Sequence, residues 1–259
     1  MRRDIFIGDV HGCVDELDAL LTALSPQPAD RLFFLGDLVD RGPSSIGAVR
    51  RVRALIAAFP GSCAIAGNHE EKALRLRERD LAGRETRRLE PWAEEAEDRD
   101  WRFLDTLPLI CRLPERGVIM VHGGLYPRYF EMHGELGEVG PGWRRERGKR
   151  ADRLRRMLRT RRIDGTGNVA ALGEETLADP HWSQLYDGRE GFCFFGHDPQ
   201  LGPPLPLRAL HATGLDTGCC FGGRLTAAVL PEGAAPAEAT FVSVPAVIQY
   251  AEPRKRYEE

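Results

Sequence analysis

The chain carries near its start the stretch Ile5-Phe6-Ile7-Gly8-Asp9-Val10-His11-Gly12, an apolar run that stops at a glycine and leads into an aspartate and a histidine. The same pattern returns four times, at Leu32–Asp37, Ala64–His69, Val118–Gly124 and Phe192–His197. Short unbroken apolar runs are typical of strands that are buried on both faces. The sequence therefore predicts five strands that each present Asp, Asn or His side chains at the C-terminal end.

The first three of these strands are separated by two amphipathic segments. Apolar side chains recur at helical spacing in 14–24 and again in 46–59. The order is β-α-β-α-β, with a repeat of about thirty residues, the length of a βαβ unit. Right-handed crossovers would bring the three strand ends to one edge of a sheet, where ligands bind in open α/β sheets.

The remaining segments are less regular. Residues 70–105 are rich in Arg and Glu and predict helices that cover the sheet or cap its edge. Residues 144–162 hold eleven Lys or Arg against two acids and predict a basic helix. From residue 192 onward, apolar runs at 205–210, 225–230 and 240–244 predict antiparallel strands of a second sheet.

Length and composition indicate the number of domains, the kinds of partner and the cellular compartment. With 259 residues, 42% of them hydrophobic, we expect a single domain spanning 1–259, with helical or basic inserts at about 70–115 and 125–190. A net charge of −3 gives no bulk attraction to nucleic acid or membrane. Six cysteines without a CxxC pair indicate buried thiols in a reducing compartment. Since no stretch suits a membrane span or a signal peptide, we expect a soluble cytoplasmic protein.

The polar side chains at the strand ends are candidate metal ligands. They are Asp9, His11, Asp37, Asn68, His122 and His197. Carboxylate and imidazole ligands suit divalent first-row metals, and a carboxylate such as that of Asp37 can bridge two ions. Two ions about 3.5–4 Å apart can clamp a phosphate and activate a bridging water for attack at neutral pH.

Three neighbouring residues suit the remaining roles of such a site. His69 is placed to protonate a leaving oxygen, and Asp40 can hold its imidazole in the required tautomer. Arg41 can grip phosphate oxygens with its planar fork. For any one motif the alternative is a turn residue or a helix cap. Turn chemistry does not explain five such motifs at the same structural position.

These motifs occur in the order GDxHG (8–12), GDxxDRG (36–42), GNHE (67–70), HGG (122–124) and GH (196–197). In this the chain resembles the calcineurin-like metallophosphoesterases, within the phosphoprotein-phosphatase branch that includes the diadenosine tetraphosphatase-like (ApaH-like) enzymes. The resemblance implies an α/β (α+β) fold, a four-layer α/β/β/α sandwich of two mixed β-sheets flanked by helices.

The resemblance also implies roles. Asp9, His11 and Asp37 would hold one divalent metal ion, and Asp37, Asn68, His122 and His197 would hold a second. Manganese is the first choice, with iron, zinc, cobalt or magnesium as alternatives. His69 would be the general acid paired with Asp40. Arg41, Asn68 and a further arginine would bind the substrate phosphate. Arg159 is the candidate for that arginine; Arg161, Arg162 or an ordinary solvated helix face are the alternatives.

The segments 182–188 and 214–227 are similar to those of the diadenosine tetraphosphatase-like group. The resemblance implies that a metal-bridging hydroxide cleaves phosphoanhydride or phosphoester bonds of dinucleoside polyphosphates or related polyphosphates. RNA caps are a further substrate class of that group. The alternative is a serine/threonine phosphoprotein phosphatase with the same metal centre. A non-catalytic binding protein is less favoured, because every ligand position and the His69–Asp40 pair are present.

Overall fold

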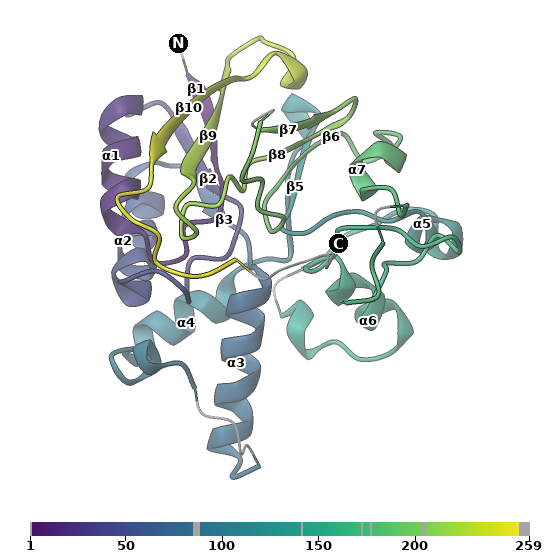
Figure 1. Cartoon of the computed structure of the whole chain (residues 1–259), viewed down its shortest axis with the longest axis horizontal. Helices are drawn as coiled ribbons and strands as arrows, with labels where there is room; N and C mark the ends of the chain where they lie inside the picture. The colour runs from purple at the N-terminus through teal and green to yellow at the C-terminus, as the bar shows by residue number, and fades with distance from the viewer. Residues whose placement is uncertain are drawn as a thin grey trace.

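A computed structural model describes residues 2–84, 89–140, 142–171, 173–176, 178–203 and 206–253. Two five-stranded sheets lie at its centre (Figure 1). The first has the order β10-β9-β1-β2-β3. Its strands are β1 (Arg3–Ile7), β2 (Arg31–Phe34), β3 (Cys63–Ala64), β9 (Arg224–Pro231) and β10 (Thr240–Pro245). The three strands of the predicted β-α-β-α-β unit are parallel neighbours, as expected.

The second sheet has the order β4-β5-β6-β8-β7. Its strands are β4 (Ile110–Leu113), β5 (Val118–Val121), β6 (Phe192–Phe195), β7 (Leu207–Ala209) and β8 (Ala212–Gly214). Strands β5, β6 and β8 run parallel, while β4 and β7 are antiparallel to their neighbours. Both sheets are therefore mixed, and the predicted α/β sandwich class is confirmed.

The assignment of the late strands to a second sheet is wrong for two of them. Strand β9 pairs antiparallel with β1, with Ile5 opposite Val229, and β10 pairs antiparallel with β9. They extend the first sheet because β1 offers a free edge on the side away from β2. Of the predicted strand at 205–210, Leu207–Ala209 forms β7, and residue 205 lies outside the described residues.

The two sheets pack face to face through alternate residues of their strands. Phe6 and Phe33 point toward the second sheet, and the ring of Phe6 stacks on Phe194 with centroids 4.1 Å apart. Ile5 and Ile7, on the other face of β1, pack in the separate core beneath the helices. Burial on both faces explains why these strands are apolar throughout.

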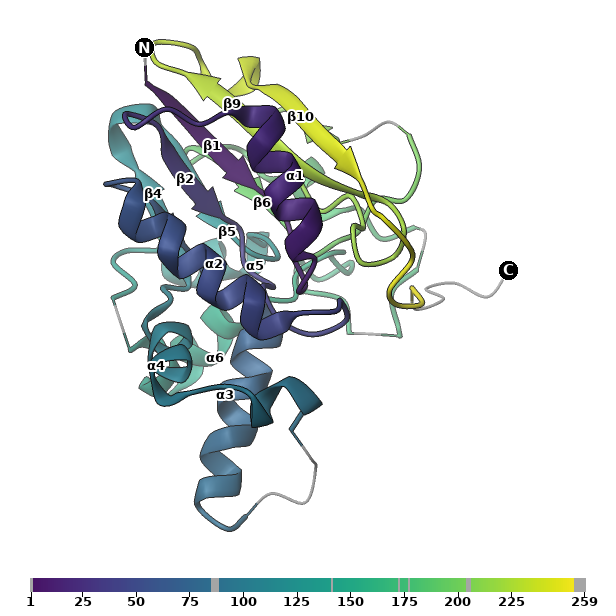
Figure 2. The same cartoon turned by 90° about the vertical axis from the view of Figure 1, so that its left-hand side faces the viewer.

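Helices form the outer layers. Helices α1 (Val14–Leu24) and α2 (Ser45–Ala58) lie over the outer face of the first sheet (Figure 2). The others are α3 (Asn68–Leu81), α4 (Asp98–Thr106), α5 (Pro127–His133), α6 (Lys149–Arg156) and α7 (Trp182–Leu185), with short 3-10 turns at Pro91–Glu94 (η1), Pro114–Arg116 (η2), Trp143–Arg145 (η3) and Pro236–Glu238 (η4). Among the described residues, no helix combines the length and apolarity needed to cross a membrane.

Two predicted segments differ in detail. Strand β4 lies inside the insert predicted as helical at 70–115. The basic stretch 144–162 is not one helix but the short turn η3 followed by α6, which ends at Arg156. The physical reason is a contact with the HGG motif: the carbonyl of Met157 accepts hydrogen bonds from the backbone N–H groups of Gly123 and Gly124 at 3.0 and 2.9 Å.

Candidate metal centre

The predicted ligands lie directly after the strands that carry them. Asp9 and His11 follow β1, Asp37 follows β2, His122 follows β5, and His197 follows β6. Their backbones are unusual: φ is positive at His11 (45°), Asp37 (48°) and His197 (70°). The same holds at Asp40 (68°) and Arg41 (72°). Such conformations cost about 1–3 kcal/mol each in residues other than glycine and gather at functional sites.

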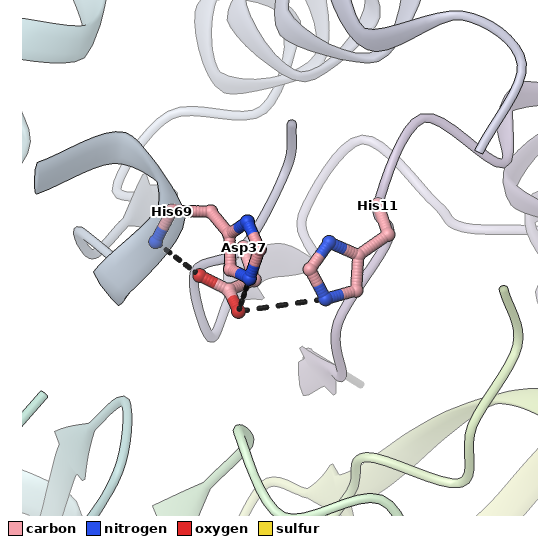
Figure 3. Close-up of side chains that lie close together, drawn as sticks. All are labelled: His11, Asp37 and His69. Atoms are coloured by element: carbon pink, nitrogen blue, oxygen red, sulfur yellow. Dashed lines mark hydrogen bonds and ion pairs between the residues drawn. The ribbon is translucent and has the colours of Figure 1, made fainter. Parts of the chain in front are cut away.

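Two groups of candidate ligands meet at Asp37. In the first, ligand atoms of His11, Asp37 and His69 lie within 4.8 Å of one another (Figure 3). In the second, the same holds for Asp37, His122 and His197. The Asp37 Oδ2 atom lies 3.4 Å from His11 Nε2 and 3.3 Å from His122 Nε2. Asp37 thus lies between the two groups, as a bridging carboxylate must.

The two histidines nearest Asp37 are oriented by backbone carbonyls. His11 Nδ1 lies 2.8 Å from the Val39 carbonyl oxygen, and His122 Nδ1 lies 2.7 Å from that of Leu35. Because a carbonyl oxygen only accepts, each Nδ1 carries a hydrogen and donates it. In the neutral ring Nε2 is then left with its lone pair facing Asp37. This is the tautomer and the supporting contact that metal-bound histidines use.

Asn68 and Asp9 lie at the edges of the groups. Asn68 Oδ1 is 3.3 Å from His122 Nε2, which places it beside the second group. Asp9 belongs to neither group by distance, and its carboxylate accepts the His197 backbone N–H at 3.0 and 3.1 Å. His69, predicted as the general acid, also has a ring nitrogen within the first group.

Electrostatics at the site favour a bound cation. Burial lowers the pKa of His11 to about 4, so its imidazole is neutral at physiological pH. Burial, Asp216 and Asp37 raise the pKa of Asp9 well above its usual value. Burial opposes ionisation of Asp37, but the attraction of His122, His69 and His11 outweighs it and holds the pKa of Asp37 well below its usual value. Burial opposes protonation of His122, but the charge of Asp37 outweighs it and raises the pKa of His122, so this imidazole holds a positive charge more readily than His11. Crowded carboxylates that attract positive charge, together with imidazole nitrogens, form a donor set that fits divalent cations.

His69 and Asp40, predicted to act as an acid–base pair, lie in direct contact. His69 Nδ1 lies 2.5 Å from Asp40 Oδ2. The other oxygen of Asp40 accepts a hydrogen bond from the indole Nε1 of Trp92 at 2.7 Å. The Nε2 atom of His69 lies 3.9 Å from Asp37 Oδ2 and 3.5 Å from Arg41 Nη2, so it faces the predicted metal ligand Asp37. That atom can exchange a proton with a substrate held there.

The arginines differ in their surroundings. The Arg41 guanidinium stacks over the ring of Phe221, 4.8 Å from its centroid. Arg159 Nη2 lies 3.0 Å from Glu71 Oε2 and 3.4 Å from the Asn68 carbonyl oxygen. Arg161 pairs with Asp198, and Arg162 donates to the Asp179 carbonyl. Arg159 therefore contacts a predicted metal ligand, Asn68.

The HGG motif explains how Arg159 comes to lie there. A Cβ atom on Gly123 would lie 2.6 Å from the Met157 carbonyl oxygen, so only glycine permits this approach. The contact ends α6 and turns the chain so that Arg159, two residues later, reaches the N-terminus of α3. The sequence contains these glycines, but it does not indicate that the Met157 carbonyl is their hydrogen-bond partner.

Two residues near the site were not predicted to have a role. Glu70 is fully buried, and its carboxylate accepts backbone N–H groups from Gly67, Asp37, Leu38 and Val39 at 2.8–3.1 Å. It joins the turn after β2 to the start of α3. Its place at the third position of a helix within the GNHE motif is a signal for capping. The other residue is Trp92, and no pattern in the sequence indicates that its indole donates a hydrogen bond to Asp40.

A family model described as calcineurin-like phosphoesterase matches residues 5–223. The chain belongs to this family. It is therefore a metallophosphoesterase, which is a hydrolase, and the family implies divalent metal ions. The donor set and the imidazole orientations described above fit such ions.

Within this family, the chain is similar to several curated relatives and to a solved structure. The chain is 33% identical to the symmetrical bis(5'-nucleosyl)-tetraphosphatase of Chromohalobacter salexigens, over 88% of this chain and 94% of the relative. It is 30% identical to the asymmetrical bis(5'-nucleosyl)-tetraphosphatase PrpE of Oceanobacillus iheyensis, over 90% of each. A crystal structure provisionally described as a diadenosine tetraphosphatase shares 32% identity and a TM-score of 0.65, covering 94% of this chain and 93% of that one. The predicted resemblance to this group is confirmed.

Proposed function

We propose that this phosphoesterase hydrolyses phosphoanhydride bonds of dinucleoside polyphosphates at a dinuclear metal centre. The observation that carries the proposal is the position of Asp37 between two groups of imidazole ligands. The names of the relatives, both symmetrical and asymmetrical bis(5'-nucleosyl)-tetraphosphatases, supply the substrate class. RNA caps and phosphoproteins are weaker candidates, and the cytoplasmic location remains a prediction.

In this proposal Asp9, His11 and Asp37 hold one ion, and Asp37, Asn68, His122 and His197 hold the other. Bound ions would supply Lewis acidity and an activated water. Manganese remains the first choice, with iron, zinc, cobalt or magnesium as alternatives, because a mixed carboxylate and imidazole set accepts all of them.

The chain's own residues supply phosphate binding and proton transfer. Arg41 and Arg159, with the amide of Asn68, bind the phosphate oxygens, since guanidinium groups match the geometry of phosphate. His69 gives a proton from Nε2 to the leaving oxygen, while Asp40 accepts the hydrogen bond from Nδ1 and stabilises the charged imidazole. The buried position of Asp40 keeps this hydrogen bond away from water.

The test is product analysis with diadenosine tetraphosphate and manganese, run with Asp37→Ala and His69→Asn. We expect turnover in the wild type and a loss of at least about 100-fold in both variants. Two ADP molecules would show a symmetrical cut, and AMP plus ATP an asymmetrical one. His133→Asn, at the end of α5 and outside both ligand groups, is the matched control. Absence of turnover together with rapid phosphate release from a phosphopeptide would overturn the proposed substrate class.

A further inference from the structure

A second set of potential metal ligands lies outside the centre described above. It consists of Cys13, Glu16 and Cys219, which we call the thiol cluster. Two thiol sulfurs and one carboxylate oxygen lie within 4.8 Å of one another. The ligand atoms around a tetrahedral zinc ion lie about 3.5–3.8 Å apart, given Zn–S of ~2.3 Å and Zn–O of ~2.1 Å. A small contraction would therefore close the cluster around one ion.

The cluster is shielded from solvent. The exposed fractions are 0% for Cys13, 1% for Glu16 and 2% for Cys219. Cys13 and Glu16 lie at the start of α1, and Cys219 lies in the loop between β8 and β9. Residues about two hundred positions apart in the chain thus present soft and hard ligands to one small interior volume.

The Glu16 carboxylate is held in one orientation. Its Oε1 atom accepts the backbone N–H of Val247 at 2.8 Å and the hydroxyl of Tyr250 at 2.9 Å. Its Oε2 atom is buried and has no hydrogen-bond partner within the described part of the chain. A buried carboxylate oxygen without a partner is unfavourable, and a bound cation would satisfy it. Fixing one oxygen and leaving the other free is how outer contacts orient a ligating carboxylate.

We propose that the thiol cluster binds a divalent cation of the zinc class, separately from the centre at Asp37. Two thiolates with one carboxylate favour zinc over magnesium or calcium, because sulfur ligands select softer ions. Binding releases the two thiol protons to solvent, and the three side chains supply three of the four positions of a tetrahedral ion. The proposal does not depend on the substrate of the enzyme.

Such a site would tie together segments that lead to the catalytic centre. Cys13 follows His11 by two residues, and Cys219 follows Asp216 by three. The carboxylate of Asp216 acts electrostatically on Asp9. Through Glu16, the same site reaches the segment after β10, at Val247 and Tyr250. An ion here would therefore fix the start of α1 against two loops.

The test uses cobalt as a spectroscopic probe on the full chain, freed of metal with a chelator and kept reduced. A thiolate–cobalt bond gives an intense near-ultraviolet charge-transfer band, which imidazole and carboxylate ligands do not give. We expect this band in the wild type and its displacement by added zinc. Cys219→Ala should lose the band and bind one fewer ion per chain. Glu16→Gln, which preserves shape, should weaken cobalt binding about tenfold or more.

Two controls isolate the site. Cys63 and Cys111 also lie close enough for their thiols to hydrogen-bond, but no third candidate ligand in the described ranges joins them, so Cys63→Ala should keep the band. Asp37→Ala should also keep the thiolate–cobalt band, because Asp37 belongs to the proposed catalytic centre and not to the thiol cluster. Absence of the band in the wild type, or its persistence in Cys219→Ala, would overturn the proposal.

Discussion

The indole Nε1 of Trp92 donates a hydrogen bond of 2.7 Å to Asp40 Oδ1, and the other oxygen of Asp40 lies 2.5 Å from His69 Nδ1. Both oxygens of the carboxylate are therefore engaged, one by the proposed acid and one by a ring 52 residues away in the chain. Burial opposes ionisation of Asp40, but His69, Trp92 and Lys72 outweigh it and keep the pKa of Asp40 below its usual value. Trp92 thus supports the negative charge on Asp40 that the proposed role of His69 requires.

The first prediction concerns Trp92→Phe, which removes the donor and keeps an aromatic ring. We expect kcat to fall by about three- to tenfold with little change in KM. A hydrogen bond to a charged group is worth about 1.5–3 kcal/mol, and a water molecule that hydrogen-bonds to Asp40 in the variant would restore part of this free energy. Trp101→Phe is the control, since its ring packs against Trp92 at 5.3 Å. A larger effect of Trp101→Phe than of Trp92→Phe on kcat would contradict this role.

The second prediction concerns Glu70, which joins the turn after β2 to α3. In Glu70→Gln the amide nitrogen faces backbone N–H groups that need an acceptor, so at least one buried donor loses its partner. We expect the free energy of unfolding of the metal-free protein to fall by about 2–4 kcal/mol, measured by urea denaturation. Metal binding should weaken as well, because Asp37 lies in that turn.

Glu78→Gln is the matched control for Glu70. It lies on the same helix, and its carboxylate is 60% exposed in its ion pair with Arg144. An ion pair whose carboxylate lies in solvent contributes about 0–1 kcal/mol. If the two glutamine variants were equally stable, Glu70 would not hold the turn in place.

The sequence predicted the polar side chains at the strand ends, but it did not predict how distant segments pair or which distant side chains contact the site. The ligands could be found because each strand and its turn form one local pattern of apolar run, glycine and polar side chain. Strand β9 could not be assigned to its sheet, because its pairing with β1 joins residues more than two hundred positions apart. Trp92 reaches Asp40 through the folding of η1 against the site, and no spacing rule encodes that contact.

The third prediction follows from His11, whose pKa burial lowers from 6.5 to about 4. Between these values the unfolded state binds a proton that the folded state does not. Stability of the metal-free protein should therefore decrease as the pH falls from about 7 to 4, and His11 should contribute about 3 kcal/mol of that loss. The measurement is urea denaturation across this range for wild type and His11→Gln.

Because other buried groups also titrate, the difference between the two proteins carries the information. His11→Gln should show a shallower pH dependence than the wild type. His133→Gln removes an imidazole outside both ligand groups and should follow the wild type. Parallel curves for wild type and His11→Gln would mean that burial does not keep this imidazole neutral.

The last prediction tests whether Arg159 binds phosphate or only adds to the charge of the basic stretch. Its guanidinium lies beside Glu71 and the Asn68 carbonyl, at the edge of the second ligand group. Arg159→Ala should lower kcat/KM for diadenosine tetraphosphate about 10- to 100-fold, the loss expected for charge-assisted hydrogen bonds. Arg159→Lys should recover only part of the lost kcat/KM, because an ammonium lacks the planar fork.

Lys149→Ala is the control. It removes the same charge from an exposed position in the same stretch and should have little effect on kcat/KM near 0.15 M salt, where distant surface charges are screened. If the two alanine variants lost activity equally, and if both losses vanished at high salt, the stretch would act by general attraction and Arg159 would have no direct contact with the substrate.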